Sequence, residues 1–492
     1  MEYTTLGAVD LGSNSFHLAI GRVDGDQIYP LDSLKETVRL ASGLTPDKTL
    51  DSLAQDRALA ALRTFSQRLA GMPKETVRVV GTNALRVARN AGPFLRRAEE
   101  VLGFPIEVIP GREEARLIYL GVVHSLPMAG HNRLVVDIGG GSTEFIIGHK
   151  LKPKAMESLY MGCVSHTGRF FGDGRIDRKS FRQAELAARE QVQAIATRFQ
   201  REGWKEAVGS SGTARSIAEV LQKNGRSDGH IDAAGLAWLR DQLVEAGELR
   251  KLTLLGLREE RIPVVAGGVA IMSGIFDELG LEEMTVASGA LRDGVLWDLL
   301  GRVHHRDIRE VTVERFAKRY HVDLVQAQRV ARTAQALLER LDSGGDLAQR
   351  AHFLAWAARL HEIGISIAQG AYHKHSAYIL ANADMPGFSR QEQGWLSNLV
   401  LAQRGKLAKM RAAFDDDPRL AALAFCLRVA VIFHRSRRTL PLPRLEASRK
   451  GRAFRLAVDR AWLDQQTLID VALSAETEQW RSVGTELQLE RL

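Results

Sequence analysis

The sequence predicts an α/β fold up to about residue 301, followed by an all-helical domain and a small α+β domain. In the first region, short apolar runs rich in β-branched residues alternate with longer helical patterns and glycine turns. From about residue 302 glycine thins out, and alanine, leucine, arginine and histidine recur with helical spacing. Beyond about residue 446, alternating apolar and polar residues indicate short strands.

Length and composition indicate a soluble chain of several domains. The 492 residues suggest about three or four domains, and 45% hydrophobic with 26% charged residues is typical of a globular protein. Two cysteines, Cys163 and Cys426, are too few for a disulfide framework. The N-terminus lacks a basic region, so we expect no signal peptide. The longest apolar run, residues 262–276, contains a proline and three glycines and is too short to cross a bilayer.

The formal net charge of +8 favours an anionic partner. Polyphosphate, a nucleotide, nucleic acid and an acidic membrane surface all fit this charge, and so does a basic surface that serves solubility alone. Walker A and G-x-G-x-x-G sequences are absent from the chain, which disfavours a P-loop or a dinucleotide-binding fold.

A central motif reads as an apolar run, a glycine turn and a second apolar run over residues 134–147. The glycine triplet, residues 139–141, lacks Cβ atoms, so its backbone can turn sharply and approach a ligand. Consecutive N–H groups in such a turn form a nest that binds phosphate oxygens. Asp137 and Glu144, at the edges of the turn, are hard oxygen ligands of the kind that hold Mg²⁺. On this motif alone, a plain hairpin with a glycine turn is an equally good interpretation.

A second copy of the motif stands near the N-terminus. Residues 10–15 and 137–142 share the pattern D-[LI]-G-[SG]-[NG]-S, and each copy lies between two apolar runs. An internal repeat of a whole supersecondary unit is far less probable by chance than either copy alone. The repeat therefore predicts two similar hairpins that face each other and clamp the two ends of a polyphosphate.

The remaining elements follow from the same periodicities. A third glycine-serine turn, residues 207–213, fits a phosphate or nucleotide end as well as it fits a helix cap. Strands are expected within residues 1–40 and at 77–80, 106–109, 152–161, 454–458 and 486–490, and helices at 49–70, from 112, and at 178–201, 313–341, 352–367 and 420–433.

Three side chains stand out beside these elements. Arg86 follows a strand end, where open α/β sheets place ligand-binding groups, although a surface arginine fits the position too. Glu114 leads an apolar helical stripe, so we expect it to be partly desolvated, which raises its proton affinity and suits it to general-base work. Glu113 shares its helix face with Arg116 and is expected to be solvated.

The two hairpins resemble the phosphate-binding hairpins of the superfamily of actin, sugar kinases and heat-shock chaperones. With three further segments they resemble one branch of it, the exopolyphosphatase and guanosine pentaphosphate phosphohydrolase family. The glycine triplet and the His-Lys-His-Ser stretch that begins at His373 are more similar to the exopolyphosphatase than to its sibling. The segments that carry the resemblance are residues 10–17, 81–86, 113–118, 137–144 and 289–294, with 361–364 and 373–378 in the helical region.

The resemblance implies an architecture of four domains. Two actin-like (ribonuclease H-like) domains, 1–124 and 125–301, would each carry one phosphate hairpin, followed by a helical HD-like domain, 302–445, and a small α+β domain, 446–492. Long bacterial exopolyphosphatases of this type usually act as dimers, so we expect a homodimer.

The helical region departs from the metal pattern of the HD phosphohydrolases. His361 is followed by Glu362 rather than aspartate, and Gln326 stands where a first histidine would precede Arg329. We interpret this domain as a scaffold and an anion channel, with histidines that pack rather than bind metal.

The resemblance also implies an activity. We expect Mg²⁺-dependent hydrolysis of the terminal phosphoanhydride of inorganic polyphosphate, which releases orthophosphate; the alternative is conversion of guanosine pentaphosphate to the tetraphosphate. Mn²⁺ could replace Mg²⁺, and a monovalent cation could stimulate. Glu114 would activate water, Asp137 and Glu144 would hold the metal, and Arg86 and Arg261 would grip phosphates. Backbone N–H groups would bind phosphoryl oxygens at Ser13, Asn14, Ser15, Gly139, Gly140, Gly141, Ser142 and Thr143.

Two other classes of function stay open. A kinase of this fold would need a pocket for a phosphoryl acceptor, and a non-catalytic binder of polyphosphate or alarmone would keep the hairpins but tolerate loss of Glu114. We expect a cytoplasmic protein that requires no nucleic acid, and peripheral association with the inner face of the membrane stays open.

Overall fold

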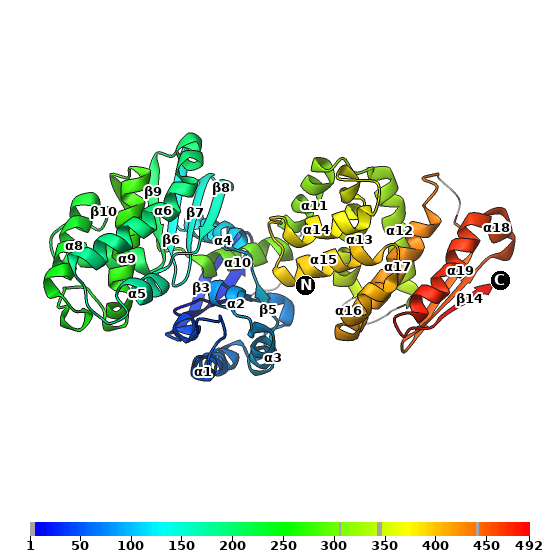
Figure 1. Cartoon of the computed structure of the whole chain (residues 1–492), viewed down its shortest axis with the longest axis horizontal. Coiled ribbons are helices and arrows are strands. Elements are labelled where there is room, and N and C mark those ends of the chain that lie inside the picture. The colour runs from blue at the N-terminus through cyan, green and yellow to red at the C-terminus, as the bar shows by residue number, and fades with distance from the viewer. Residues whose placement is uncertain (1–4, 305–306, 342–346, 439–441) are drawn as a thin grey trace. The chain divides into compact units, whose positions relative to one another are not determined.

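The structure, a computed structural model, divides into two compact units, Met1–Asp307 and Ile308–Leu492, coloured along the chain in Figure 1. The expected boundary between residues 301 and 302 falls inside a helix, α10 (Leu291–Val303). The structure describes residues 5–304, 307–341, 347–438 and 442–492.

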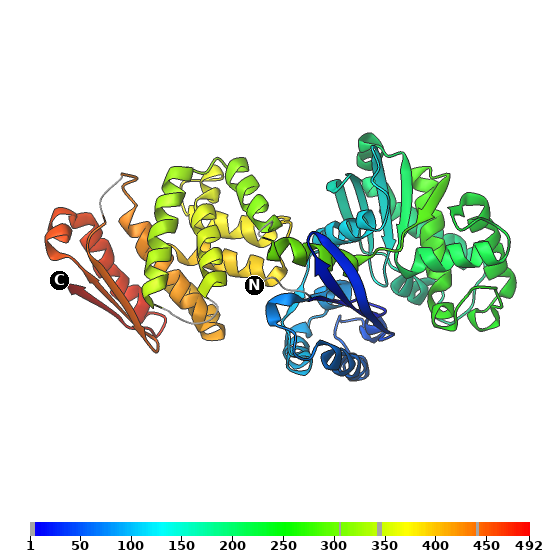
Figure 2. The ribbon, with the colours of Figure 1, turned by 180° about the vertical axis from the view of Figure 1, so that it is seen from behind.

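A five-stranded sheet forms the base of the first half of unit one, in the order β3-β2-β1-β4-β5. β1, β2 and β3 form an antiparallel ribbon, seen in dark blue in Figure 2, and β4 and β5 continue the sheet parallel to β1. The strands are β1 (Thr5–Leu11), β2 (Phe16–Asp24), β3 (Gln27–Glu36), β4 (Val77–Gly81) and β5 (Ile106–Val108).

A second sheet has the order β10-β11-β9-β6-β7-β8. Starting from β8, its strands repeat the order and the directions of the first sheet: two antiparallel pairings are followed by two parallel ones. The repeat inferred from two hairpins therefore extends to two whole domains, and the predicted α/β class is confirmed. The strands are β6 (Asn132–Ile138), β7 (Thr143–His149), β8 (Lys152–Leu159), β9 (Glu206–Ser210), β10 (Ile231–Asp232) and β11 (Glu283–Val286).

Helices cover both faces of the second sheet, which explains the uninterrupted apolar run of β6. Leu134 and Val136 belong to one hydrophobic cluster and Val135 to another, so both faces of the strand are buried. The α-helices of this unit are α1 (Ser52–Leu69), α2 (Asn83–Val87), α3 (Ala91–Leu102), α4 (Gly111–His124), α5 (Cys163–Phe170), α6 (Arg178–Glu202), α7 (Ser211–Lys223), α8 (Ala233–Ala246), α9 (Ile262–Leu279) and α10. Short 3₁₀ turns are η1 (Leu40–Gly43), η2 (Lys74–Thr76), η3 (Leu249–Lys251) and η4 (Glu259–Arg261).

One helical stretch in the described residues, Glu259–Leu279, has the length and composition to cross a membrane. Its apolar window is 72% buried inside the protein, as expected of a core helix. It includes α9, which packs in the same hydrophobic cluster as β6.

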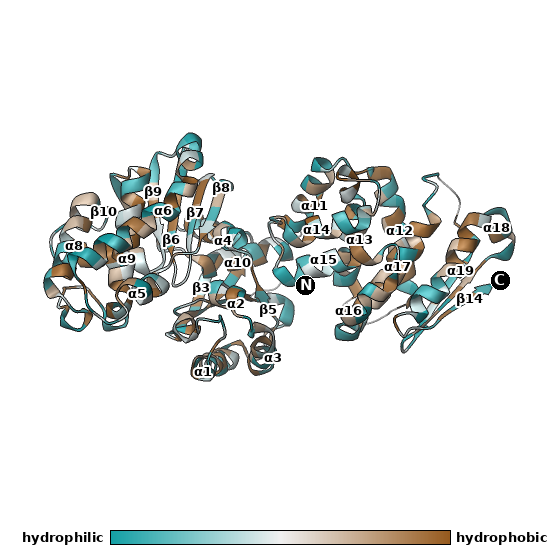
Figure 3. Cartoon of the chain, viewed as in Figure 1, coloured by the Kyte–Doolittle hydropathy of each residue, from teal (hydrophilic) through white to brown (hydrophobic). Residues whose placement is uncertain are grey.

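The second unit joins the helical region and the C-terminal strands around one hydrophobic core. Phe425 of α17 stacks on Phe454 of β13 with 4.5 Å between ring centroids, and Trp480 of α19 packs against both. Figure 3 colours the residues of this unit by hydropathy, and α17 is buried along most of its length, at residues 420–430. The elements are α11 (Ile308–Arg319), α12 (Leu324–Leu341), α13 (Leu347–Leu360), η5 (Ile363–Ser366), α14 (Tyr372–Asn382), α15 (Arg390–Ala402), η6 (Leu407–Met410), α16 (Arg411–Asp416), α17 (Pro418–Phe433), β12 (Leu445–Lys450), β13 (Ala453–Val458), α18 (Arg460–Gln465), α19 (Thr467–Arg481) and β14 (Leu487–Arg491).

Candidate active site

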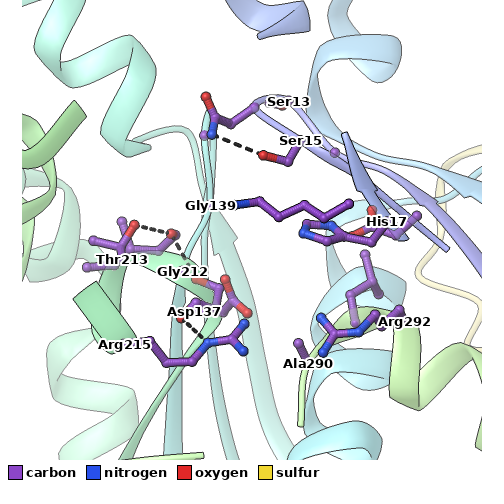
Figure 4. A pocket seen from close by; sticks show the side chains of 18 of the residues that line it. Ser13, Ser15, His17, Asp137, Gly139, Gly212, Thr213, Arg215, Ala290 and Arg292 are labelled. Atoms are coloured by element: carbon purple, nitrogen blue, oxygen red, sulfur yellow. Dashed lines mark hydrogen bonds and ion pairs between the residues drawn. The ribbon is translucent and has the colours of Figure 1, made fainter. Parts of the chain in front are cut away.

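A cavity of about 390 Å³ lies where the two hairpin turns meet the first turns of α7 and α10 (Figure 4). All four elements belong to the first compact unit. The cavity therefore collects groups from both sheets, at the carboxyl ends of β1 and β6, the edge at which α/β folds bind ligands.

The two hairpins have the same register. Asp10 pairs with His17 across β1 and β2, and Asp137 pairs with Glu144 across β6 and β7. The turns touch, because a Cβ atom on Gly140 would lie only 2.9 Å from the Cβ atom of Ser13. The absence of a side chain at this glycine allows the two phosphate-binding turns to approach each other closely.

Most of the backbone groups expected to bind phosphate face this cavity. Gly141 and Thr143 do not line it. The hydroxyl of Thr143 is buried and donates to the carbonyl oxygen of Met161 at 2.6 Å, and Gly141 packs so close to Asn83 that a Cβ atom would overlap the amide oxygen. The expected residues that line the cavity are Ser13, Asn14, Ser15, Gly139, Gly140 and Ser142.

The expected base, Glu114, lines the cavity and forms an ion pair with Arg86 behind it. Nη1 of Arg86 lies 2.6 Å from Oε2 of Glu114, and the two side chains are 2% and 9% exposed. Arg86 also donates to the carbonyl oxygen of Ile109 at 3.0 Å. Burial raises the pKa of Glu114 above its usual range, and the cation of Arg86 opposes that rise.

The two carboxylates expected to bind metal lie at different depths. Asp137 lines the cavity, and burial raises its pKa to about 6 against hydrogen bonds from Ser211 and Ser210. Glu144 is 1% exposed and accepts a hydrogen bond from the hydroxyl of Ser158 at 2.8 Å. Its pKa lies well above the usual range, first because of burial and then because of neighbouring carboxylates. Glu144 therefore stands behind the wall of the cavity rather than in it.

Asp10 is a cavity carboxylate that the sequence argument did not single out as a ligand. Its Oδ1 atom is buried and has no hydrogen-bond partner among the described residues, and its Oδ2 atom lies 3.5 Å from Nδ1 of His17. The signal was present in the repeat, because Asp10 is the counterpart of Asp137.

The acidic groups suit a metal held jointly by protein and phosphate. The described residues contain no group of three or more metal-ligating side chains arranged around one point. Mg²⁺ is commonly bound through one or two carboxylates and the phosphates of its substrate. Asp10 and Asp137, with an unpartnered buried oxygen between two phosphate turns, fit that arrangement.

Arginines form the other side of the cavity. Arg261, expected from the sequence, lies over Gly212, where a Cβ atom would overlap its Nη2 atom. Arg215 and Arg292 also line the cavity and were not expected. Both stand next to motifs that were noted, residues 207–213 and 289–294, but the direction of their side chains depends on tertiary structure.

An ion pair joins the two halves of the unit beside these arginines. Nζ of Lys35 on β3 lies 2.5 Å from Oε1 of Glu260 on η4, and both residues line the cavity. The pair connects the first sheet to the segment that carries Arg261.

A buried ionic network anchors α4, the helix whose first turn carries Glu114. Glu113 was expected to be solvated, and this was wrong: it is 3% exposed and accepts two hydrogen bonds of 2.8 Å from Arg116. Arg116 also pairs with Asp298 of α10, which lies 2.7 Å from Nη1 of Arg78 on β4. Helical periodicity indicates the charged face of α4. It could not show that α10, which carries Asp298, covers that face.

One histidine of the helical region, His361, packs against backbone. His361 is 1% exposed, and its Nδ1 lies 2.6 Å from the carbonyl oxygen of Ala358. Gln326 donates to the carbonyl oxygen of His434 at 2.7 Å. Within the described residues this region holds no metal-ligating cluster.

Comparison with known families decides the identity of this fold. The model of the Ppx/GppA phosphatase family matches residues 19–303, and that of Ppx/GppA phosphatase domain III matches residues 308–477. The chain belongs to the Ppx/GppA phosphatase family. The family resemblance inferred from the motifs is thereby confirmed, and the expected activity is confirmed at the level of a phosphatase.

Relatives of known name within the Ppx/GppA family differ in substrate. A guanosine-5'-triphosphate,3'-diphosphate pyrophosphatase of Aeromonas hydrophila is 39% identical over 97% of both chains. The solved exopolyphosphatase of Cytophaga hutchinsonii is 28% identical, with a TM-score of 0.55 over 60% of this chain and 97% of that one. A Ppx/GppA enzyme of Aquifex aeolicus, 23% identical with a TM-score of 0.51 over 60% of this chain and 99% of that one, shares the fold.

Proposed function

We propose that this protein hydrolyses the terminal 5'-phosphate of guanosine pentaphosphate and leaves the tetraphosphate. The observation that carries the proposal is the buried carboxylate of Glu114 at the edge of a cavity formed by two phosphate-binding hairpins. The full-length similarity to a guanosine pentaphosphate pyrophosphatase supports this substrate over the polyphosphate first expected from the sequence.

The arrangement supplies what phosphoryl transfer to water requires. Such reactions depend mainly on positioning and on neutralising charge at the transferred group. The hairpin turns at Ser13 and Gly140 would bind the terminal phosphoryl oxygens through their N–H groups. Glu114, with a pKa raised by burial, would accept the proton of the attacking water as a general base.

Arg86 would serve two groups in this scheme. Its guanidinium bonds Glu114 at 2.6 Å behind the cavity wall, and it would reach a phosphate oxygen bound beside that carboxylate. A planar guanidinium can bind a carboxylate and a phosphate oxygen with different nitrogens. Arg86 thus holds the carboxylate of Glu114 in one orientation. The rigid plane of the guanidinium also fixes the directions of its other N–H groups.

We propose Mg²⁺ as the cofactor. Asp10 and Asp137 would hold it at the cavity, with Glu144 behind them acting through water. The metal would neutralise charge on the transferred phosphoryl group. Asp137 must lose its proton for this role, and its raised pKa makes metal binding dependent on pH.

Inorganic polyphosphate is the second candidate substrate. The structural similarity to an exopolyphosphatase, which extends over 60% of this chain, supports it. The same chemistry at the terminal phosphoanhydride would serve both substrates, which differ only beyond the bond that breaks.

The test is orthophosphate release, with Mg²⁺, from guanosine pentaphosphate and from long-chain polyphosphate. Wild type is compared with Glu114→Gln and with a matched control, Glu100→Gln, which changes an exposed glutamate on α3. We expect the pentaphosphate to be preferred, Glu114→Gln to lose about 100-fold or more in kcat while still binding substrate, and the control to match wild type.

Each other outcome changes the proposal. Turnover of polyphosphate alone makes the protein an exopolyphosphatase with the same site. Full activity of Glu114→Gln removes the assigned base. If neither substrate is hydrolysed but both bind, the protein is a binder rather than an enzyme.

A further inference from the structure

Three of the four arginines that line the cavity have poorly compensated charges. Among the described residues, no carboxylate lies within ion-pair distance of Arg215 or Arg261, and the nearest to Arg292 is Asp293 at 3.7 Å. The other cations of the cavity wall are paired: Lys35 with Glu260, and Arg258 with Glu219. Cations that share a partly buried cavity without counter-charges favour an anionic ligand.

Two of these arginines stand opposite each other. In Figure 4 the guanidinium groups of Arg215 and Arg292 point toward each other from two sides of the pocket. Arg215 belongs to the first turns of α7 and Arg292 to the first turn of α10. Nε of Arg215 donates to the carbonyl oxygen of Ser211 at 3.0 Å, which fixes the side chain and leaves the two terminal nitrogens directed into the cavity.

The arginine pair and the base have different ionic partners. Arg86 forms the ion pair with Glu114, with Nη1 2.6 Å from Oε2. Arg215 and Arg292 come from α7 and α10, whereas Glu114 comes from α4, and all three side chains line the same cavity.

The cavity thus offers different groups to the two sides of a scissile phosphoanhydride bond. In the proposed reaction water attacks the terminal phosphorus from the side of Glu114, and the leaving phosphate departs on the opposite side, because attacking and leaving oxygens lie in line. We propose that Arg215 and Arg292 form a second phosphate subsite, which binds the phosphates on the leaving side of the scissile bond. The inference rests on the proposed function and extends it to the part of the substrate that is not transferred.

With a second subsite of this kind, the protein would recognise a chain of linked phosphates rather than a single phosphate group. The bond between the terminal phosphorus and the bridging oxygen breaks, water supplies the new oxygen and passes a proton to Glu114, and the electron pair of the broken bond stays on the bridging oxygen of the leaving phosphate. Guanidinium groups stabilise that growing negative charge and hold the ground-state chain as well. Both candidate substrates carry at least one more phosphate next to the scissile bond, so both would use it.

The experiment measures binding in a catalytically silenced parent. Glu114→Gln is titrated at fixed Mg²⁺ with orthophosphate, which is too short to span both sites and is expected to prefer the two hairpin turns, and with tripolyphosphate, which spans both. The variants add Arg215→Gln, Arg292→Gln or both, and the matched control adds Arg250→Gln, whose side chain is 83% exposed outside the cavity. Thermal melts of every variant verify that it is folded.

We expect tripolyphosphate to lose about tenfold or more in affinity with each arginine removed, as for a charged hydrogen bond. Orthophosphate affinity should change less than about twofold, and lysine at either position should restore part of the loss. The subsite is overturned if the folded double variant binds tripolyphosphate as tightly as the parent, or if the parent binds tripolyphosphate no tighter than orthophosphate. If the parent binds neither anion, the proposed function fails together with the subsite that rests on it.

Discussion

Nη1 of Arg86 lies 2.6 Å from Oε2 of Glu114, and the protein buries both side chains almost completely. The group proposed to bind phosphate is thus bonded to the group proposed to activate water. Burial raises the pKa of Glu114, and Arg86 offers the main opposing effect. The activity of Glu114 as a base should therefore depend on Arg86 even before substrate binds.

Replacing Arg86 with glutamine should shift the acid limb of the pH–activity profile to higher pH. Glu114 must be ionised to accept a proton, and loss of the adjacent cation of Arg86 raises its pKa further. The measurement is kcat/KM against pH for wild type and Arg86→Gln. A variant with lower activity but an unmoved acid limb would show that Arg86 only binds phosphate.

Magnesium should stabilise the protein more at neutral pH than in mild acid. Burial raises the pKa of Asp137 to about 6, so the metal must displace a proton below that pH. The pKa of Asp137 is raised in the folded protein. The metal-free protein therefore loses stability as pH rises from the ordinary aspartate pKa through about 6. Bound Mg²⁺ should offset that loss above about pH 6. Thermal melts with and without Mg²⁺ at about pH 5 and about pH 7.5 test this.

Asp137→Asn is the control for the metal experiment. The amide keeps the shape of the side chain but has no charge, so Mg²⁺ should give little stabilisation at either pH. An equal effect of Mg²⁺ on wild type at both pH values would contradict the assignment of Asp137 as a ligand.

The hairpins could be predicted because their chemistry is local. The turn between Asp137 and Glu144 requires small residues, and its counterpart after Asp10 repeats them together with the first of the two acids. The strands on either side are identified by apolar runs that are buried on both faces. The position of Glu114 also followed from its own helix, because the stripe that it leads packs into the core.

Contacts between distant segments could not be predicted in this way. Glu113 faces Asp298, which is far away in the sequence, through Arg116, so the periodicity of one helix could not reveal its burial. Arg215 and Arg292 come from two helices that meet only at the cavity. Glu144 was assigned to the metal from its place in the turn, but it points behind the cavity wall because Ser158 binds it there.

Alanine at Gly212 should reduce activity while leaving the fold intact. A Cβ atom there would overlap Nη2 of Arg261 and displace that guanidinium from the cavity. A misplaced phosphate ligand typically costs about 100-fold in rate. The measurement is kcat and KM for Gly212→Ala, with Gly168→Ala as the control, since nothing lies within 4 Å of a Cβ atom at that position. Wild-type kinetics for Gly212→Ala would mean that Arg261 is not needed where the structure has it.

Removing the charge of Asp298 should destabilise the protein strongly. Asp298 pairs with Arg116 and Arg78, and all three side chains are less than 10% exposed. Asp298→Asn leaves these cations without their counter-charge, which costs about 3–5 kcal/mol in similar buried networks. The measurement is the free energy of unfolding in urea, with Asp241→Asn, from an exposed ion pair with Arg240, as a control expected to change little.

The difference in unfolding free energy between wild type and Asp298→Asn should also depend on pH. The neighbouring arginines hold the pKa of Asp298 well below its usual range, despite burial. A lowered folded pKa gives stability that is present above the ordinary aspartate pKa and is lost as pH falls. The gap in unfolding free energy between wild type and Asp298→Asn should therefore be full at neutral pH and should narrow in acid. A gap that stays constant down to about pH 3 would mean that shape, rather than charge, accounts for the loss.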